Sequence, residues 1–336
     1  MDKIITLAHG SGGSATLSLI DNVFKKYFKN DILSAGDDSA RLDMGNAKNI
    51  VFTTDSFVVT PVFFSGGNIG KLAVCGTVND LATSGAVPLY LSCGFIIEEG
   101  FGLDELEQIV KTMSETAREC GVQIVTGDTK VVQKGAADKI FINTSGIGVV
   151  PEGIDISGRN AKVGDKILVS GTIGDHGSCI LLEREKMGFQ AEIKSDCAPL
   201  AGMVKDMLKV TSEIHVLRDP TRGGVATTLN EIASQSRVTL QINEEQLPVK
   251  REVQGVCELL GMDPLYMANE GKLLVFVPGE HAGQVLQALR ENPYGRDAQI
   301  IGEVTAGGEP RVLLKALSGG IRIIKLLAGD QLPRIC

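Results

Sequence analysis

Four short acidic segments in the first half of the chain carry the residues best suited to bind a metal ion. Their carboxylates are Asp38 in GDDSA, Asp55 in TTDS, Asp80 in VNDLATSGAVP and Asp128 in VTGDTK. Asp55 and Asp128 are expected at the ends of strands, where side chains emerge at the edge of a sheet. Mg²⁺ prefers carboxylate, phosphate and water oxygens as ligands. Any one of these aspartates is more simply a helix cap or turn residue, but the four together favour a site for Mg²⁺ and a nucleotide.

Glycine-rich segments near these aspartates could bind phosphate. The segment AHGSGGS (8–14) precedes the first predicted helix, so its backbone amides could bind an anion, although an ordinary loop fits equally well. SGGNIGKL (65–72) resembles a P-loop but has too few residues between its glycines and no Ser or Thr after Lys71, so we reject that interpretation.

Two motifs in the second half carry further charged residues. RDPTRGGV (218–225) opens a predicted helix, and Arg222 with the two glycines favours an anion site. ANEGKLLVF (268–276) places Glu270 on a turn just before a strand. The alternative for Glu270 is a solvated loop carboxylate.

The chain ends in QLPRIC, which puts a thiol on its last residue, Cys336. Free cysteines usually pack in cores, whereas chain ends are usually mobile and wet. We predict that residues 327–336 form a flexible tail, because they show no hydrophobic periodicity. Cys75, Cys93 and Cys120 lie in apolar patterns and are predicted core residues.

The remaining pattern alternates helices and strands. Helices are predicted at 14–28, 68–84, 103–120, 198–209, 224–235 and 281–291, and strands at 50–59, 89–97, 122–128, 140–150, 166–170, 238–242, 272–277 and 299–304. The polar, glycine-containing segment 151–165 is a predicted domain junction. We therefore expect an α/β plus α+β fold, with domains at 1–155 and 156–326 and a tail at 327–336.

Composition excludes several classes of partner. The net charge is −8, the pI is about 5.2 and no basic run occurs, which disfavours nucleic acid and anionic membranes. No stretch approaches the roughly 18 apolar residues of a membrane span, and the first residues lack a signal-peptide pattern. Seven widely spaced cysteines without a C-x-x-C pair fit a reducing compartment. We expect a cytoplasmic protein.

In order along the chain, the motifs resemble those of the HypE family of hydrogenase maturation proteins. The matching segments are AHGSGG, DDSARL, FTTDSFVV, GGNIGKLAVCGTVNDLATSGAVP, VTGDTKVV, DPTRGGV, NEGKL and the terminal PRIC. They run from about residue 7 to the end of the chain. The TVND and GDTK elements are shared with a wider superfamily that includes aminoimidazole ribonucleotide synthetase and selenophosphate synthetase, whereas PRIC is specific to HypE.

The resemblance implies a fold. It predicts the two-domain PurM-like architecture of the aminoimidazole ribonucleotide synthetases. The sheet of the N-terminal domain would pair with that of a second subunit to form a barrel in a homodimer. ATP would lie in a cleft between the domains.

It also implies a reaction and its partners. A carbamoyltransferase, HypF, would place a carbamoyl group on the sulfur of Cys336. ATP and Mg²⁺ would then be used to dehydrate the thiocarbamate to a thiocyanate. The cyanide would pass to iron on a HypC–HypD scaffold, for the active site of [NiFe] hydrogenase.

Site residues follow from the same resemblance. It implies Mg²⁺ or phosphate contacts by Asp38, Asp55, Asp80 and Asp128, and nucleotide contacts by Lys71, Asn79, Gly127, Thr129 and Arg222. Lys130 and Glu270 would move the protons of the carbamoyl group carried by Cys336.

Two alternatives stay open on sequence alone. One is a small-molecule synthetase or kinase of the selenophosphate synthetase type, although such an enzyme keeps its reactive cysteine near the N-terminus and the first cysteine here is Cys75. The other is a non-enzymatic carrier of the carbamoyl or cyano group.

Overall fold

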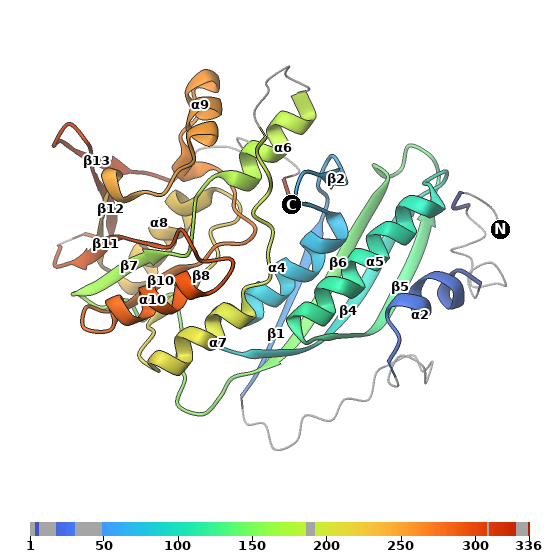
Figure 1. Cartoon of the computed structure of the whole chain (residues 1–336), viewed down its shortest axis with the longest axis horizontal. Coiled ribbons are helices and arrows are strands. Elements are labelled where there is room, and N and C mark those ends of the chain that lie inside the picture. Colours follow the sequence, from blue (N-terminus) through green and yellow to red (C-terminus); the bar gives the residue numbers. More distant parts are fainter. Residues whose placement is uncertain (1–3, 7–17, 31–48, 186–191, 308, 327–334) are drawn as a thin grey trace.

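Two β-sheets, one in each half of the chain, organise the molecule (Figure 1). The structure is a computed structural model that describes residues 4–6, 18–30, 49–185, 192–307, 309–326 and 335–336. The first sheet has the strand order β1-β6-β4-β5 and the second has the order β13-β12-β9-β11-β7-β10-β8. β2 and β3 form a separate small hairpin.

The first sheet is covered on one face by two helices (Figure 1). Its strands are β1 (Ile50–Phe57), β4 (Val87–Glu98), β5 (Gln123–Val132) and β6 (Ile140–Val149). The covering helices are α4 (Ile69–Thr83) and α5 (Leu103–Cys120), and the separate hairpin consists of β2 (Phe63–Phe64) and β3 (Gly67–Asn68). A short π-helix, η2 (Ile20–Phe24), and the α-helical turn α2 (Lys25–Tyr27) precede them in the chain. β4 and β5 are parallel, while β6 pairs antiparallel with both β1 and β4.

The two helices differ in how much of their surface is buried, because they have different neighbours. α5 is amphipathic, as its sequence predicts, and Gly121 ends it in the left-handed conformation at φ 71°. α4 is buried almost all round, because it lies between the first sheet, α5 and the second half of the chain. Asn68 caps α4 by accepting hydrogen bonds from the backbone N–H groups of Gly70 and Lys71.

The second sheet has helices on both faces. Its strands are β7 (Asp165–Val169), β8 (Val216–Arg218), β9 (Thr239–Asn243), β10 (Leu274–Pro278), β11 (Gln299–Thr305), β12 (Arg311–Lys315) and β13 (Ile321–Ile324). The helices are α6 (Asp175–Glu185), α7 (Ala201–Val210), α8 (Gly224–Ser236), α9 (Arg251–Leu260) and α10 (Ala282–Glu291). Two short 3-10 helices are η3 (Glu244–Gln246) and η4 (Pro264–Tyr266). α8 shares a buried cluster with β9, β11 and β12, whereas α7 and α10 share another with β7 and β10.

Every helix and strand predicted within the described residues is present, but several elements were not predicted. The segments left unassigned by the sequence pattern contain β2, α6, β8, η3, α9, η4, β12 and β13. The apolar residues of α6 are consecutive (Ile180, Leu181, Leu182) and therefore lack helical periodicity. β6 ends at Val149 and β7 begins at Asp165, so the predicted domain boundary between 155 and 156 falls in the segment that joins them.

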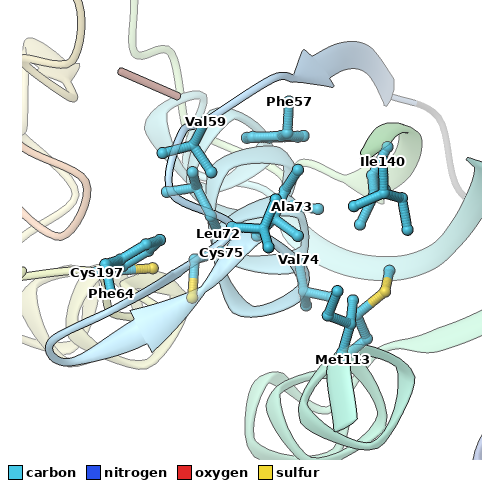
Figure 2. Packing of buried hydrophobic residues seen from close by; sticks show 14 of the residues in the cluster. Phe57, Val59, Phe64, Leu72, Ala73, Val74, Cys75, Met113, Ile140 and Cys197 are labelled. Carbon is cyan, nitrogen blue, oxygen red and sulfur yellow. The ribbon is translucent and has the colours of Figure 1, made fainter. Parts of the chain in front are cut away.

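The largest buried cluster crosses from one half to the other. It joins residues of α4 and α5 with Cys179 of α6, Cys197 and Cys257, and it includes Ile335 near the end of the chain. Figure 2 shows Leu72, Ala73, Val74 and Cys75 of α4 at the centre of this cluster, with Cys197 close to Cys75. The halves therefore share one buried cluster, while the second half also has two clusters that are almost entirely its own.

The cysteine predictions are confirmed for two of three positions. Cys75 and Cys93 are buried, whereas Cys120 is half-buried against the same cluster. All seven cysteines lie in the described residues, and none forms a disulfide. Of the helices that the structure describes, none has the length and apolar character needed to cross a membrane.

Candidate functional site

The last two residues of the chain are docked between its two halves, beside β2 (Figure 1). Ile335 is buried in the shared core, and the backbone oxygen of Cys336 accepts a hydrogen bond of 3.0 Å from the N–H of Val58. A guanidinium N–H of Arg222 points at the Cys336 Sγ atom at 3.4 Å. The prediction of a flexible tail at 327–336 is therefore wrong for its last two residues, which are docked. Residues 327–334 lie outside the described residues.

Glu270 is buried next to this thiol. Its Oε1 atom has no hydrogen-bond partner among the described residues. The pKa of Glu270 is raised well above its ordinary value, first because the carboxyl is buried and next because of electrostatic repulsion from the nearby Cys336. The alternative of a solvated loop carboxylate is therefore wrong. A buried carboxylate with one unbonded oxygen and a raised pKa can accept a proton from a group attached to Cys336.

The backbone that carries Glu270 is fixed by a buried ion pair. Asp196 accepts hydrogen bonds from the N–H groups of Glu270 (3.2 Å) and Gly271 (3.1 Å), and its Oδ2 lies 3.2 Å from the Nζ of Lys272. Both side chains of the Asp196–Lys272 pair are buried. The charge of Lys272 lowers the pKa of Asp196 against the cost of burial. Asp196 thus holds the turn in place while leaving the carboxyl of Glu270 unused.

The motifs around Arg222 and Glu270 are bonded to each other. The backbone N–H and the side-chain amide of Asn269 both donate to the carbonyl oxygen of Pro220, at 3.2 and 2.9 Å. Gly224 begins α8 at φ 61°, and a Cβ there would lie 2.5 Å from the carbonyl oxygen of Met267. The glycine therefore permits the start of α8 to pack against the segment that leads to Glu270.

Three carboxylates gather on the same side of the molecule. Asp55 lies near the end of β1, Asp80 lies near the end of α4, and Asp219 follows β8. Burial is the first cause of a raised pKa in all three; the charge of Asp55 adds to it at Asp80, and the charge of Asp80 adds to it at Asp219. A cation bound between these carboxylates would reduce the repulsion between their negative charges.

Within the described part of the chain, no group of three His, Cys, Asp or Glu side chains is arranged to hold a metal ion as it stands. Asp38 lies outside that part. Asp219 is a residue that sequence analysis missed, because β8, the strand that it follows, was not predicted from the sequence pattern.

Asp128 and Lys130 lie elsewhere. The expectation that Asp128 ends a strand is wrong, because β5 continues to Val132. β5 and β1 are the two edges of the first sheet, three strand spacings or about 14 Å apart. Asp128 and Lys130 form an exposed ion pair of 2.8 Å, and the hydrogen bond from Lys130 lowers the pKa of Asp128. A single chain thus brings Asp55 and Asp80 together but leaves Asp128, Lys130, Gly127 and Thr129 at the opposite edge.

Lys71 and Asn79 also have positions of their own. Lys71 is nine residues before Asp80 on α4, about 13 Å along the helix, and lines a cavity of about 270 Å³ with Asp196 and Lys272. The buried amide of Asn79 donates to the carbonyl of Ala198 (3.1 Å) and accepts from the N–H of Leu200 (2.8 Å). Both ends of the Asn79 amide are thus used to join the two halves. The nucleotide contacts of Lys71 and Asn79 stay predictions.

Comparisons with known proteins agree with this architecture. Residues 36–150 match the family model for the N-terminal domain of AIR synthase related proteins, and residues 162–315 match that for the C-terminal domain. The chain is 52% identical to the carbamoyl dehydratase HypE of Bradyrhizobium diazoefficiens over 333 residues, which cover 99% of this chain and 96% of that protein.

Solved structures give the same result. A crystal structure of the hydrogenase maturation protein HypE in complex with ATP has a TM-score of 0.95 and 50% identity, covering 98% of this chain and 99% of that one. A crystal structure of a HypE–HypF complex has a TM-score of 0.81 and 51% identity, covering 92% of this chain and 100% of that one. The two-domain fold implied by the sequence motifs is confirmed, and the chain belongs to the HypE family of hydrogenase maturation proteins, within the AIR synthase related proteins.

Proposed function

We propose that this chain is an ATP-dependent carbamoyl dehydratase that converts a thiocarbamate on its own Cys336 into a thiocyanate. One observation carries the proposal: the C-terminal thiol is docked between Arg222 and the buried carboxyl of Glu270. A relative that shares half of its residues over nearly the full length is a carbamoyl dehydratase. That relationship supports a self-modifying enzyme over a free small-molecule synthetase or a passive carrier.

The chemistry accounts for each group that leaves. The carbonyl oxygen of the S-carbamoyl group is a poor leaving group, so transfer of the γ-phosphoryl of ATP to it makes phosphate the leaving group. The C–O bond then breaks and two protons leave the nitrogen, which gives Cys-S-C≡N, ADP, phosphate and the released protons. Glu270 lies where it can accept a nitrogen proton. Arg222 is suited to hold the sulfur or the carbonyl oxygen, since its guanidinium already faces Sγ.

ATP and Mg²⁺ fit the acidic cluster. The HypE crystal structure with ATP supports nucleotide binding by this chain. Asp55, Asp80 and Asp219 would hold Mg²⁺, which would offset the charge of the phosphates. Burial raises the pKa of all three, and the charge of a neighbouring aspartate raises it further at Asp80 and Asp219. Asp38 stays a predicted ligand outside the described residues.

A homodimer would explain the residues on β5. The face of the first sheet away from α4 and α5 exposes large apolar side chains, Ile50 and Phe52 on β1 and Ile96 on β4. Pairing of this face with that of a second copy would cover them. It would also place Gly127, Asp128, Thr129 and Lys130 of one copy near the acidic cluster of the other. We propose that the four residues act there, with Lys130 as the second group that moves a proton.

The partners follow from the chemistry of the tail. HypF would carbamoylate Cys336, as the HypE–HypF complex supports, and a HypC–HypD scaffold would accept the cyanide. Seven cysteines without a disulfide fit a cytoplasmic location. The acidic chain, with no basic run, still disfavours nucleic acid and membrane partners.

Mass spectrometry of the C-terminal peptide tests the proposal. The chain is carbamoylated by HypF with carbamoyl phosphate and ATP, purified, and then given Mg²⁺ and ATP. The mass of the Cys336 peptide should fall by that of one water molecule, and Cys336→Ser should show neither the carbamoyl adduct nor the loss. A carbamoylated peptide that keeps its full mass with Mg²⁺ and ATP would exclude the dehydratase.

A further inference from the structure

His176 is a buried histidine that the proposed reaction does not use. It is the second residue of α6 and is fully buried. Its ring meets the ring of Phe64 edge to face, with 5.5 Å between the centroids. A histidine in such a place is costly unless both ring nitrogens are bonded, so its partners indicate what it is for.

One of those partners belongs to the tail. The Nε2 atom of His176 lies 2.7 Å from the carbonyl oxygen of Ile335, and its Nδ1 atom lies 2.8 Å from the Oγ of Ser195. A carbonyl oxygen only accepts hydrogen bonds, so Nε2 must carry the proton. Burial lowers the pKa of His176, which keeps the ring neutral and leaves Nδ1 as an acceptor.

Ser195 completes a chain of hydrogen bonds with one direction. The N–H of Cys197 donates to Ser195 Oγ at 3.1 Å, so the hydroxyl is free to donate its own proton to His176. Ser195 is itself anchored, because its N–H donates to the carbonyl of Ser65 at 2.8 Å. The order Cys197 N–H, Ser195 O–H, His176 N–H, Ile335 C=O thus selects one tautomer of His176 and aims its proton at the tail.

The same short segment also positions the proton acceptor. Ser195 orients His176, while the next residue, Asp196, holds the N–H groups of Glu270 and Gly271. Ala198 and Leu200, a few residues later, are bonded to Asn79 of α4. Residues 195–200 therefore fix the tail and the turn of Glu270 relative to each other.

We propose that His176, oriented by Ser195, is a positioning residue that holds the C-terminal tail in the cleft, so that the group on Cys336 stays beside Glu270. The consequence for dehydration rests on the proposed function; the docking of the tail does not. His176 acts through the Ile335 carbonyl and contacts no reacting atom.

Three variants and a control test this. His176→Phe keeps an aromatic ring against Phe64 but removes the donor; His176→Gln restores an N–H that can reach Ile335; Ser195→Ala removes only the orienting hydroxyl. His215→Phe is the matched control. His215 is another histidine largely shielded from solvent, but its partner is the carboxylate of Asp165, at 2.9 Å, and it does not contact the described residues of the tail. The rate of Cys336 alkylation by iodoacetamide is read on the C-terminal peptide, without ATP or any partner, alongside deuterium exchange at the Val58 amide.

We expect Cys336 of His176→Phe to be alkylated about tenfold faster, because one buried hydrogen bond to the docked tail is lost. Exchange at Val58 should rise as well, since that amide is bonded to Cys336. His176→Gln should lie close to the parent chain, and Ser195→Ala should lie between the two. Carbamoylation by HypF should not slow, whereas dehydration should slow by a similar factor at unchanged KM for ATP.

Two results would overturn the proposal. The first is a folded His176→Phe with the alkylation rate and Val58 protection of the parent. The second is equal exposure of Cys336 in His215→Phe, which would indicate general loosening. If His176→Phe does not fold, Ser195→Ala decides by the same two readouts. A parent chain that never dehydrates its thiocarbamate would remove the proposed function but leave the alkylation result readable.

Discussion

The two edges of the first sheet carry the same kinds of residue in opposite electrostatic states. At the β1 edge, Asp55 and the neighbouring Asp80 are partly buried and their pKa values are raised. At the β5 edge, Asp128 is exposed, paired with Lys130, and its pKa is lowered. The motifs TTDS and TGDTK look equivalent in sequence. The difference shows that burial and the nearest partner, not the motif, decide what a carboxylate can do within one chain.

The largest effect is expected at the thiol that the β1 edge adjoins. Cys336→Ser should abolish thiocyanate formation, because a serine oxygen cannot replace the sulfur that carries the carbamoyl group and then the cyano group. The midpoint of thermal unfolding should stay nearly unchanged, since Ile335 still fills its buried position. Mass spectrometry and a thermal melt measure the two quantities. Loss of the fold in this variant would instead make Cys336 a structural residue.

Removing the proton acceptor should come next. Glu270→Gln should slow dehydration by about 10²- to 10⁴-fold while carbamoylation by HypF continues at the parental rate. Single-turnover mass spectrometry of the carbamoylated chain separates the two steps. The matched control is Glu280→Gln, at an exposed position before α10, which should change neither. Equal rates in the parent and Glu270→Gln would move the base to another residue.

The carboxylate that the sequence did not single out gives the sharpest comparison between the edges. Asp219→Asn should weaken the apparent affinity for Mg²⁺ by about 10- to 100-fold in a titration of the dehydration rate. Asp128→Asn should change the free energy of unfolding of a single chain by less than about 0.5 kcal/mol, because its ion pair is exposed. An Asp219→Asn variant with parental Mg²⁺ dependence would remove Asp219 from the site.

Mixing variants can join the two edges across a dimer. Asp55→Asn and Asp128→Asn should each be impaired alone, and subunits of the two exchanged into one dimer should recover part of the activity. In the mixed dimer one site has an intact Asp55 from one copy and an intact Asp128 from the other. No recovery, with exchange confirmed by native mass spectrometry, would contradict the sheet pairing proposed here.

The last effect concerns how stability depends on pH. The pKa of Glu270 is higher in the folded chain than its ordinary 4.5, so the folded state binds the proton more tightly than the unfolded state. Its contribution to stability is full below 4.5 and is lost as pH rises toward the folded pKa, by up to about 1.4 kcal/mol per pH unit. The free energy of unfolding should therefore fall less steeply above pH 4.5 in Glu270→Gln than in the parent. Denaturant titrations from pH 4 to 8 would show parallel curves if the carboxyl were solvated.

Local pattern and motif order predicted most of the fold but only part of the site. α5 was predicted with its correct ends because its apolar residues repeat with helical period and Gly121 stops it. Asp55, Asp80, Arg222, Glu270 and Cys336 were predicted and lie on the same side of the molecule. The role of His176 could not be predicted, because no local motif surrounds it and its function depends on a carbonyl 159 residues away. The separation of Asp128 from Asp55 could not be predicted either, since strand order is set by long-range pairing.

The burial of Ile335 has a consequence for how the enzyme turns over. The last residues behave as a tethered ligand of their own protein, with an effective concentration set by the chain that links them to β13. Burying an isoleucine side chain contributes about 1.5 to 3 kcal/mol, and the hydrogen bonds to His176 and Val58 add to it. An affinity of this modest size suits a residue that, under the proposed function, is released and rebound in every cycle. A tail that bound much more tightly would stay docked and would be a poor substrate for HypF. We therefore expect selection to limit the affinity that the Ile335 side chain contributes.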